Sequence, residues 1–192
     1  MNLNLKNKGV VINIDNTGMY YRIAKRLNTE GADSFIKNKK QDHDHIYNGS
    51  IKINALVNIK ENHKVEDDSD FLKPFHHANC LADNFTIINI GTKNTLGIKT
   101  NAYKNDNINL DKKADLLEQE LNIKSINIVY PDTTLIAGID QSNIPTNEAY
   151  YNSVNEQIVD SVAFFIAQKT VLKNGQIIFI DNGLHLLQAA SI

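Results

Sequence analysis

The strongest hydrophobic pattern in the chain predicts a long helix at about residues 147–173. Its apolar positions are spaced three and four residues apart, which is typical of one helix face. Further apolar positions widen that face, so residues 158–167 are apolar around most of the circumference. Such a helix is normally covered on more than one side, either by two layers of its own chain or by a second copy. The apolar positions are Val154, Ile158, Val159, Val162, Ala163, Phe165 and Ile166.

Short runs rich in β-branched residues predict strands. In residues 51–60, isoleucine, alanine and valine alternate with polar residues, which is typical of a strand with one buried face. We expect it to pair with an antiparallel neighbour, because its other face would be wet. Residues 85–90 and 96–100 flank a glycine-containing loop and predict a hairpin. The other expected strands are 9–15, 126–130, 133–139 and 176–180, and short helices are expected at 19–27 and 111–121.

These elements predict an α+β fold, with a mixed, largely antiparallel sheet and the helix at about 147–173 packed on it. An α/β three-layer arrangement is the alternative. A chain of 192 residues with 42% hydrophobic residues can bury one sizeable core, so we expect residues 1–192 to form a single domain. The polar, lysine-rich segment around residues 28–45 is expected to be an exposed excursion.

Charge and cysteine content restrict the partners and the compartment. The net charge is −2, and Arg22 and Arg26 are the only arginines, which argues against nucleic acid as a partner. No run approaches the roughly 18–20 apolar residues of a membrane span, and no signal peptide is evident. Cys80 is the only cysteine, which suits the cytoplasm or another reducing compartment. Asparagine, isoleucine and lysine dominate, as in A+T-rich genomes, and we interpret many of the asparagines as surface filler.

Histidine and cysteine offer one alternative chemistry. His43 and His45 would point to the same side of an extended strand, and a short helix would place His76 and Cys80 one turn apart. Three imidazoles and one thiolate could bind zinc, either as a structural or as a catalytic site. Nothing in the sequence brings the two pairs together, so exposed loop histidines and a buried cysteine are the preferred interpretation, with no metal site.

Residues 10–18, Val-Val-Ile-Asn-Ile-Asp-Asn-Thr-Gly, resemble the opening motif of haloacid-dehalogenase-type phosphotransferases. That resemblance implies a nucleophilic aspartate, followed two residues later by an aspartate that acts as acid and base. Here Asn13 occupies the first position and Asp15 the second. A carboxamide has no anionic oxygen to attack phosphorus, so the resemblance implies a degenerate phosphotransferase, with Asp15 as the alternative catalytic residue.

Residues 133–140, the long helix and residues 175–181 are similar to part of the N-terminal half of thiolase-fold condensing enzymes. The resemblance implies a cysteine nucleophile, for which Cys80 is the alternative candidate. Cys80 lies outside the similar segment, and the chain is too short for both halves of that fold.

Several common enzyme signatures are missing from the sequence: it has no P-loop, no dinucleotide glycine fingerprint and no Gly-x-Ser-x-Gly elbow. The preferred hypothesis is therefore a non-enzymatic structural, assembly or protein-binding subunit, without cofactor or catalytic residues. Its apolar helix would be buried against partner chains or a second copy. The alternatives are a metal-dependent enzyme and the degenerate phosphotransferase-like or condensing-enzyme-like proteins.

Overall fold

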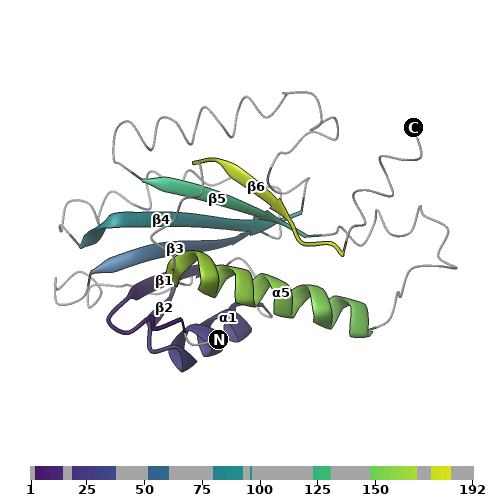
Figure 1. Cartoon of the computed structure of the whole chain (residues 1–192), viewed down its shortest axis with the longest axis horizontal. Helices are drawn as coiled ribbons and strands as arrows, with labels where there is room; N and C mark the ends of the chain where they lie inside the picture. The colour runs from purple at the N-terminus through teal and green to yellow at the C-terminus, as the bar shows by residue number, and fades with distance from the viewer. Residues whose placement is uncertain are drawn as a thin grey trace, which may run out of the picture.

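The described residues build one parallel β-sheet (Figure 1). In the computed structural model these residues are 3–14, 19–37, 52–60, 80–92, 96, 123–130, 148–167 and 174–182. The sheet has six strands in the order β2-β1-β3-β4-β5-β6, and all five neighbouring pairs are parallel. The strands are β1 (Gly9–Ile14), β2 (Asp33–Lys37), β3 (Ile53–Lys60), β4 (Leu81–Gly91), β5 (Lys124–Val129) and β6 (Gln176–Phe179).

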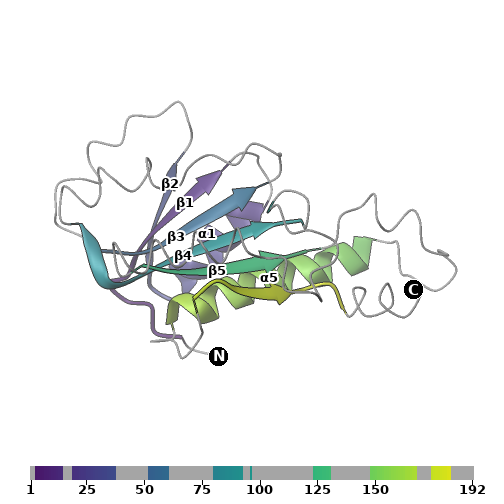
Figure 2. The same ribbon diagram turned by 90° about the horizontal axis from the view of Figure 1, so that it is seen from above.

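Two helices, α1 (Met19–Thr29) and α5 (Glu148–Ala167), lie side by side on one face of the sheet, here called the helix face (Figures 1 and 2). The main core lies between these helices and the strands. A second cluster, which includes Val11, Leu56 and Ile87, lies on the opposite face, here called the far face. Both faces of the sheet therefore carry an apolar cluster, as is usual for parallel sheets. The main core includes Val10, Ile12, Ile23, Leu27, Val57, Ile90, Ile128, Ile158 and Val162.

The predicted α+β fold with a largely antiparallel sheet is wrong, and β3 shows why. We interpreted its polar positions as a wet face, which would require an antiparallel neighbour. In the structure β3 pairs in parallel with β1 and β4, and Leu56 and Asn58 on its far face are both buried. Asn58 can be buried because its amide bonds to asparagines on both neighbouring strands. The observed class is α/β, which the sequence analysis ranked second.

The hairpin predicted from residues 85–90 and 96–100 is also wrong. Strand β4 is an interior strand whose two edges are occupied by β3 and β5, both parallel to it. No edge remains for an antiparallel return strand. Leu96 is a buried turn residue that packs with Val129, Ile177 and Phe179.

Strand β2 lies within the polar segment around residues 28–45 and was missed as a strand. Only Phe35 and Ile36 are large apolar residues in it, and it sits at the edge of the sheet beside β1. Helix α1 leads toward it and ends before Gly31, whose positive φ of 90° suits a residue without a Cβ. The predicted helix at 111–121 and strand at 133–139 lie outside the described residues, as do residues 168–173 of the long helix. The single-domain assignment stays a prediction.

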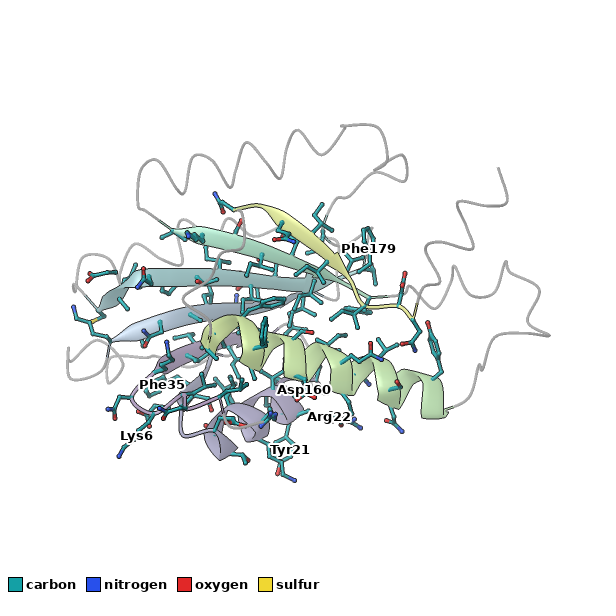
Figure 3. All side chains as sticks on the ribbon, in the orientation of Figure 1. Lys6, Tyr21, Arg22, Phe35, Asp160 and Phe179 are labelled. Carbon is teal, nitrogen blue, oxygen red and sulfur yellow. The ribbon has the colours of Figure 1, made fainter. Side chains whose placement is uncertain are left out.

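Helix α1 covers a second side of α5. Arg22 on α1 bonds to Glu156 and Asn152 of α5, at 3.3 Å each, and Figure 3 shows Arg22 and Asp160 between the two helices. Arg26 Nε donates to Asp160 Oδ1 at 2.9 Å. These contacts, with the sheet beneath, give the helix the two contacts that its broad apolar face requires. Within the described part of the chain, no helix is long and apolar enough to cross a membrane.

Candidate functional site

The order of the strands places a topological switch point between β1 and β3, and the region beyond the carboxyl ends of these two strands is here called the crevice. The chain passes from β1 to β2 on one side of β1, but β3 then lies on the other side, so the connections leave the carboxyl ends in opposite directions. In open parallel sheets, this switch point is where ligands bind. Helix α1 follows β1 directly, so its amino terminus lies at the same end of the sheet. The first turn of α1 contains no acidic residue, so its N–H groups and its dipole favour an anionic ligand.

Four asparagines form a row across the sheet just before the carboxyl ends of β1, β3, β4 and β5. We call Asn13, Asn58, Asn89 and Asn127 the asparagine row. They are partners in the strand register. Asn13 Nδ2 donates to Asn58 Oδ1 at 3.2 Å, Asn58 Nδ2 donates to Asn89 Oδ1 at 3.1 Å, and Asn89 Nδ2 donates to Asn127 Oδ1 at 3.1 Å. All three bonds run in the same direction, from β1 toward β5.

The asparagine row lies on the far face, because its neighbours along each strand belong to the core of the helix face. Asn58 and Asn127 are each 1% exposed, and Asn89 is 8% exposed. A buried amide hydrogen bond contributes about 0.5–1.5 kcal/mol, whereas an unsatisfied amide costs about 1–3 kcal/mol. The row is therefore stable only as a connected set. It ends at β5, since the register partner of Asn127 on β6 is Ile177.

Hydroxyl groups follow two neighbouring strands at the same end of the sheet. Thr92 comes directly after β4 and is buried, and Tyr130 comes directly after β5. The N–H of Tyr130 donates to the carbonyl oxygen of Gly91 at 3.1 Å, which continues the pairing of β4 and β5 by one step. At the end of β6, the hydroxyl of Tyr150 on α5 donates to the backbone oxygen of the buried Asp181 at 3.0 Å.

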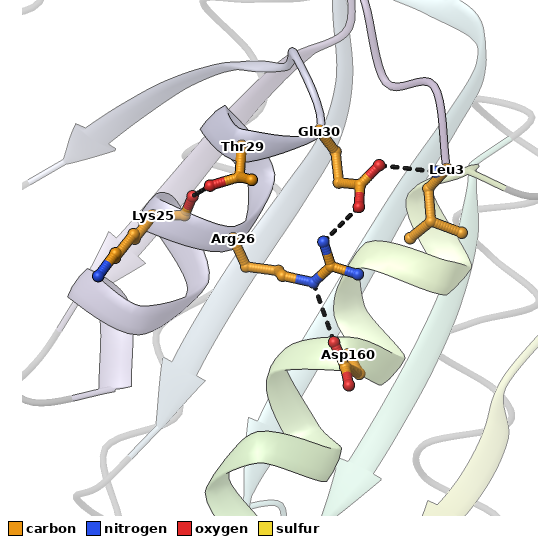
Figure 4. Close-up of polar contacts among 6 residues, drawn as sticks. All are labelled: Leu3, Lys25, Arg26, Thr29, Glu30 and Asp160. Carbon is orange, nitrogen blue, oxygen red and sulfur yellow. Dashed lines mark hydrogen bonds and ion pairs between the residues drawn. The ribbon is translucent and has the colours of Figure 1, made fainter. Parts of the chain in front are cut away.

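Both arginines are engaged in contacts with acidic or amide side chains. Arg22 contacts α5, and Arg26 lies in the last turn of α1, where it pairs with Asp160 and Glu30 (Figure 4). Hydrogen bonds to Asp160 and then Glu30 raise the pKa of Arg26 above its ordinary value. The main-chain N–H of Leu3 also donates to Glu30, at 2.6 Å. Both arginines of α1 therefore link this helix to α5.

The site residues considered from the sequence are mostly outside the described residues. These are Asp15, His43, His45 and His76, so the zinc alternative and the expectation of no metal site both stay predictions. Cys80 is described and is fully buried, next to the amino end of β4 and in the far-face cluster. Among the described residues, no group of three or more histidines, cysteines or carboxylates could hold a metal. Asn13 occupies the position of the nucleophilic aspartate in the phosphotransferase motif, and its side-chain amide donates a hydrogen bond within the asparagine row.

The asparagine row was not predicted from the sequence, although the sequence contains a signal for it. In four strand-like runs an asparagine lies between β-branched residues, as in Ile12-Asn13-Ile14 and Val57-Asn58-Ile59. The same pattern occurs as Ile88-Asn89-Ile90 and Ile126-Asn127-Ile128. We had interpreted abundant asparagine as filler. Asparagine is depleted in strands, so its recurrence inside four of them indicates shared hydrogen bonding.

By sequence, the chain matches no known protein family and no curated protein. By structure, it is similar to a short-chain dehydrogenase/reductase from Serratia marcescens, with a TM-score of 0.60 and 16% identity over 95% of this chain and 99% of that one. An aldohexose dehydrogenase from Thermoplasma acidophilum aligns over 95% of both chains, with a TM-score of 0.52 and 15% identity. BdcA, solved in complex with NADPH, aligns over 93% of this chain and 94% of its own, with a TM-score of 0.54 and 16% identity.

These similarities correct two predictions. A non-enzymatic structural or assembly subunit is not supported, because the similar proteins are dehydrogenases and reductases. The expectation of no cofactor is overturned by the same group, one member of which holds NADPH. The parallel sheet and its helices therefore give this chain the Rossmann-like α/β fold of short-chain dehydrogenases/reductases.

Proposed function

We propose that this protein binds a nicotinamide dinucleotide at the crevice between β1 and β3 and acts as an oxidoreductase on a small carbonyl or hydroxyl compound. The reversal of strand order at that crevice is the observation that carries the proposal. The dehydrogenases and reductases of similar fold support it. When bound, the nicotinamide would supply or accept a hydride.

The first turn of α1 fits the phosphate part of such a cofactor. The first turn of α1 offers backbone N–H groups and has no acidic side chain that would repel a pyrophosphate. The usual three-glycine fingerprint is absent, and between β1 and α1 the sequence has only Gly18. Met19 and Tyr20 stand at the start of α1, but they pack against the core of the helix face. Their side chains are thus accommodated beneath α1, and we expect the pyrophosphate to be bound by main-chain groups.

The sequence after β2 favours NADPH over NADH. An acidic residue about 20 positions after the glycine loop normally binds the adenosine ribose 2′-hydroxyl of NAD. Counting from Gly18, this chain has Lys37-Asn38-Lys39-Lys40 there, with no acid. Because Arg22 and Arg26 are engaged with α5, lysine is the available cation for a 2′-phosphate.

Thr92 and Tyr130 are the proposed substrate-binding hydroxyls. They follow the adjacent strands β4 and β5 at the carboxyl end of the sheet. A hydroxyl at this end can donate a hydrogen bond to a carbonyl oxygen, and a phenol can also act as a general acid. The cytoplasm or another reducing compartment suits such an enzyme. Self-association of the chain stays a prediction, which light scattering would check.

Titration with NADPH and NADH tests the cofactor. We expect saturable binding, with NADPH at least about tenfold tighter than NADH, because a charge-assisted phosphate contact has the energy for that ratio. Tyr21 lies in the first turn of α1 and is 64% exposed. Tyr21→Asp should stabilise the helix through its dipole yet weaken NADPH binding by charge repulsion, whereas Tyr21→Asn should preserve affinity. If the wild-type chain binds neither dinucleotide, the proposal is wrong.

Turnover tests the reaction separately. A panel of small aldehydes and ketones would be screened with NADPH, following the loss of reduced nicotinamide absorbance. Thr92→Val and Tyr130→Phe are expected to retain NADPH binding and to lower kcat, by about 100-fold or more if the hydroxyl is the general acid. Unchanged kcat in both variants would remove these residues from the reaction without affecting the cofactor assignment.

A further inference from the structure

The asparagine row crosses the switch point itself. The bond from Asn13 to Asn58, 3.2 Å long, joins β1 directly to β3, the two strands that flank the crevice. The remaining bonds extend the connection to β4 and β5. The four strands whose carboxyl ends surround the proposed site are therefore linked by side chains at one level.

The position of the row along the strands is informative. Two residues earlier on the far face, the corresponding register positions are Val11, Leu56, Ile87 and Ser125, which are mainly apolar. Apolar contacts are non-directional and tolerate small displacements along a strand. An amide pair needs a separation near 3 Å and a defined angle, so it fixes the relative level of two strands much more strictly. In this sheet the hydrogen bonds between asparagine side chains of neighbouring strands lie near the carboxyl ends of the strands.

We propose that the asparagine row is a positioning element that holds the carboxyl ends of β1, β3, β4 and β5 at one level beneath the cofactor. Asn58 and Asn89 are its central positioning residues, because each bonds to a row member on either side. The segments after the strands then begin from fixed points, which keeps the crevice ready for its ligand. The effect on cofactor affinity rests on the proposed function, but the effect on the strand ends does not.

Site-resolved amide hydrogen exchange tests the positioning without any ligand. The Tyr130 amide, which bonds to Gly91 at 3.1 Å, reports on the carboxyl end of the sheet. The Ile53 amide, which bonds to Cys80 at 2.7 Å, reports on the amino end. Asn89→Leu keeps the branching and the number of side-chain heavy atoms but leaves Asn58 and Asn127 without their central partner. We expect exchange at Tyr130 to accelerate about tenfold more than exchange at Ile53.

Ile87→Ala is the matched control, since Ile87 is on the same strand and face, two residues before Asn89, and is fully buried. It should accelerate exchange at Tyr130 and Ile53 to a similar extent, through general loss of stability. If Asn89→Leu does not fold, Asn127→Leu removes only the last bond of the row and should give the same selective change at Tyr130. Equal acceleration at both amides in the asparagine variant would overturn the positioning role.

Cofactor affinity gives a second measurement. NADPH should bind about tenfold more weakly to folded Asn89→Leu than to the wild type, and within about twofold of wild type to Ile87→Ala. Selective exchange with unchanged NADPH affinity would contradict the part of the proposal that concerns the crevice. If the wild-type chain binds no dinucleotide, the proposed function fails, and the exchange comparison alone then decides whether the row positions the strand ends.

Discussion

Glu30 joins three parts of the chain through one carboxylate (Figure 4). It accepts a hydrogen bond from the N–H of Leu3 at 2.6 Å and pairs with Arg26, which in turn bonds to Asp160 of α5 at 2.9 Å. The Leu3 hydrogen bond, followed by the Arg26 contacts, lowers the pKa of Glu30 below its ordinary value of 4.5. The side chain of Glu30 is only 7% exposed. Glu30 thereby connects the amino-terminal segment to the pair of helices.

Acid should destabilise the protein through Glu30. Because its pKa is lower in the folded chain than in the unfolded chain, the carboxylate stabilises the fold above about pH 4.5, and this contribution is lost as the pH falls through the lower folded value. Thermal melts between neutral pH and about pH 3 would measure the loss. Glu30→Gln should start less stable at neutral pH and lose less on acidification.

Glu156→Gln is the control for that experiment. Glu156 also pairs with an arginine, but its side chain is 67% exposed and the pair spans 3.3 Å. Exposed ion pairs contribute about 0–1 kcal/mol, so this variant should melt close to the wild type at every pH. If Glu30→Gln loses as much thermal stability on acidification as the wild type, another carboxylate is responsible for the loss.

At the scale of the element, substitutions on the buried face of α5 should lower the stability of the protein much more than substitution of its exposed aromatic residue. Ile158 is fully buried between the sheet and α1, whereas Phe164 on the same helix is 38% exposed. Ile158→Ala should reduce the free energy of unfolding by about 2–5 kcal/mol, because it leaves a cavity. Phe164→Ala should cost less than about 1 kcal/mol. Urea unfolding measures both, and a large loss in Phe164→Ala would indicate a covering that α1 does not supply.

The elements show how far the sequence could predict the fold. Apolar spacing located α5 and most strands, because it depends on neighbours within a few positions. Strand direction does not depend on such neighbours. Asn58 looks like a solvent-facing residue until its partners are known, and these lie 45 positions before it and 31 positions after it. The short edge strand β2 was missed because only Phe35 and Ile36 mark it as apolar.

The candidate site was harder to predict for the same reason. The crevice is a property of strand order, which no local pattern encodes. The missing glycine fingerprint pointed away from a dinucleotide, since Met19 and Tyr20 stand at the start of α1. Their packing beneath the helix becomes visible only in three dimensions. The sequence does contain one signal of this region. An asparagine between a β-branched residue and an isoleucine recurs in four strands.

At the scale of the whole molecule, the two strands at the crevice, β1 and β3, belong to one continuous packed unit. β1 and β3 pair along their lengths, and the asparagine row adds side-chain bonds across the same junction. The helix-face core is continuous from α1 to α5, and it includes residues of strands β1, β3, β4 and β5. A ligand that binds at the carboxyl ends of β1 and β3 would therefore contact the middle of a single sheet. Its binding energy should stabilise all of the strands together.

Ligand-linked unfolding tests this expectation. At a free NADPH concentration of about 100 times Kd, binding to the folded state alone adds about 2.7 kcal/mol to the free energy of unfolding. Urea unfolding followed by far-ultraviolet circular dichroism, and separately by hydrogen exchange in β2 and β6 at the two sheet edges, should show one transition that shifts as a whole. Tyr21→Asp should shift less at the same NADPH concentration, because its affinity is lower. If NADPH protects β2 but leaves β6 unfolding at its original urea concentration, the chain contains two cooperative units, and the single-domain prediction is wrong.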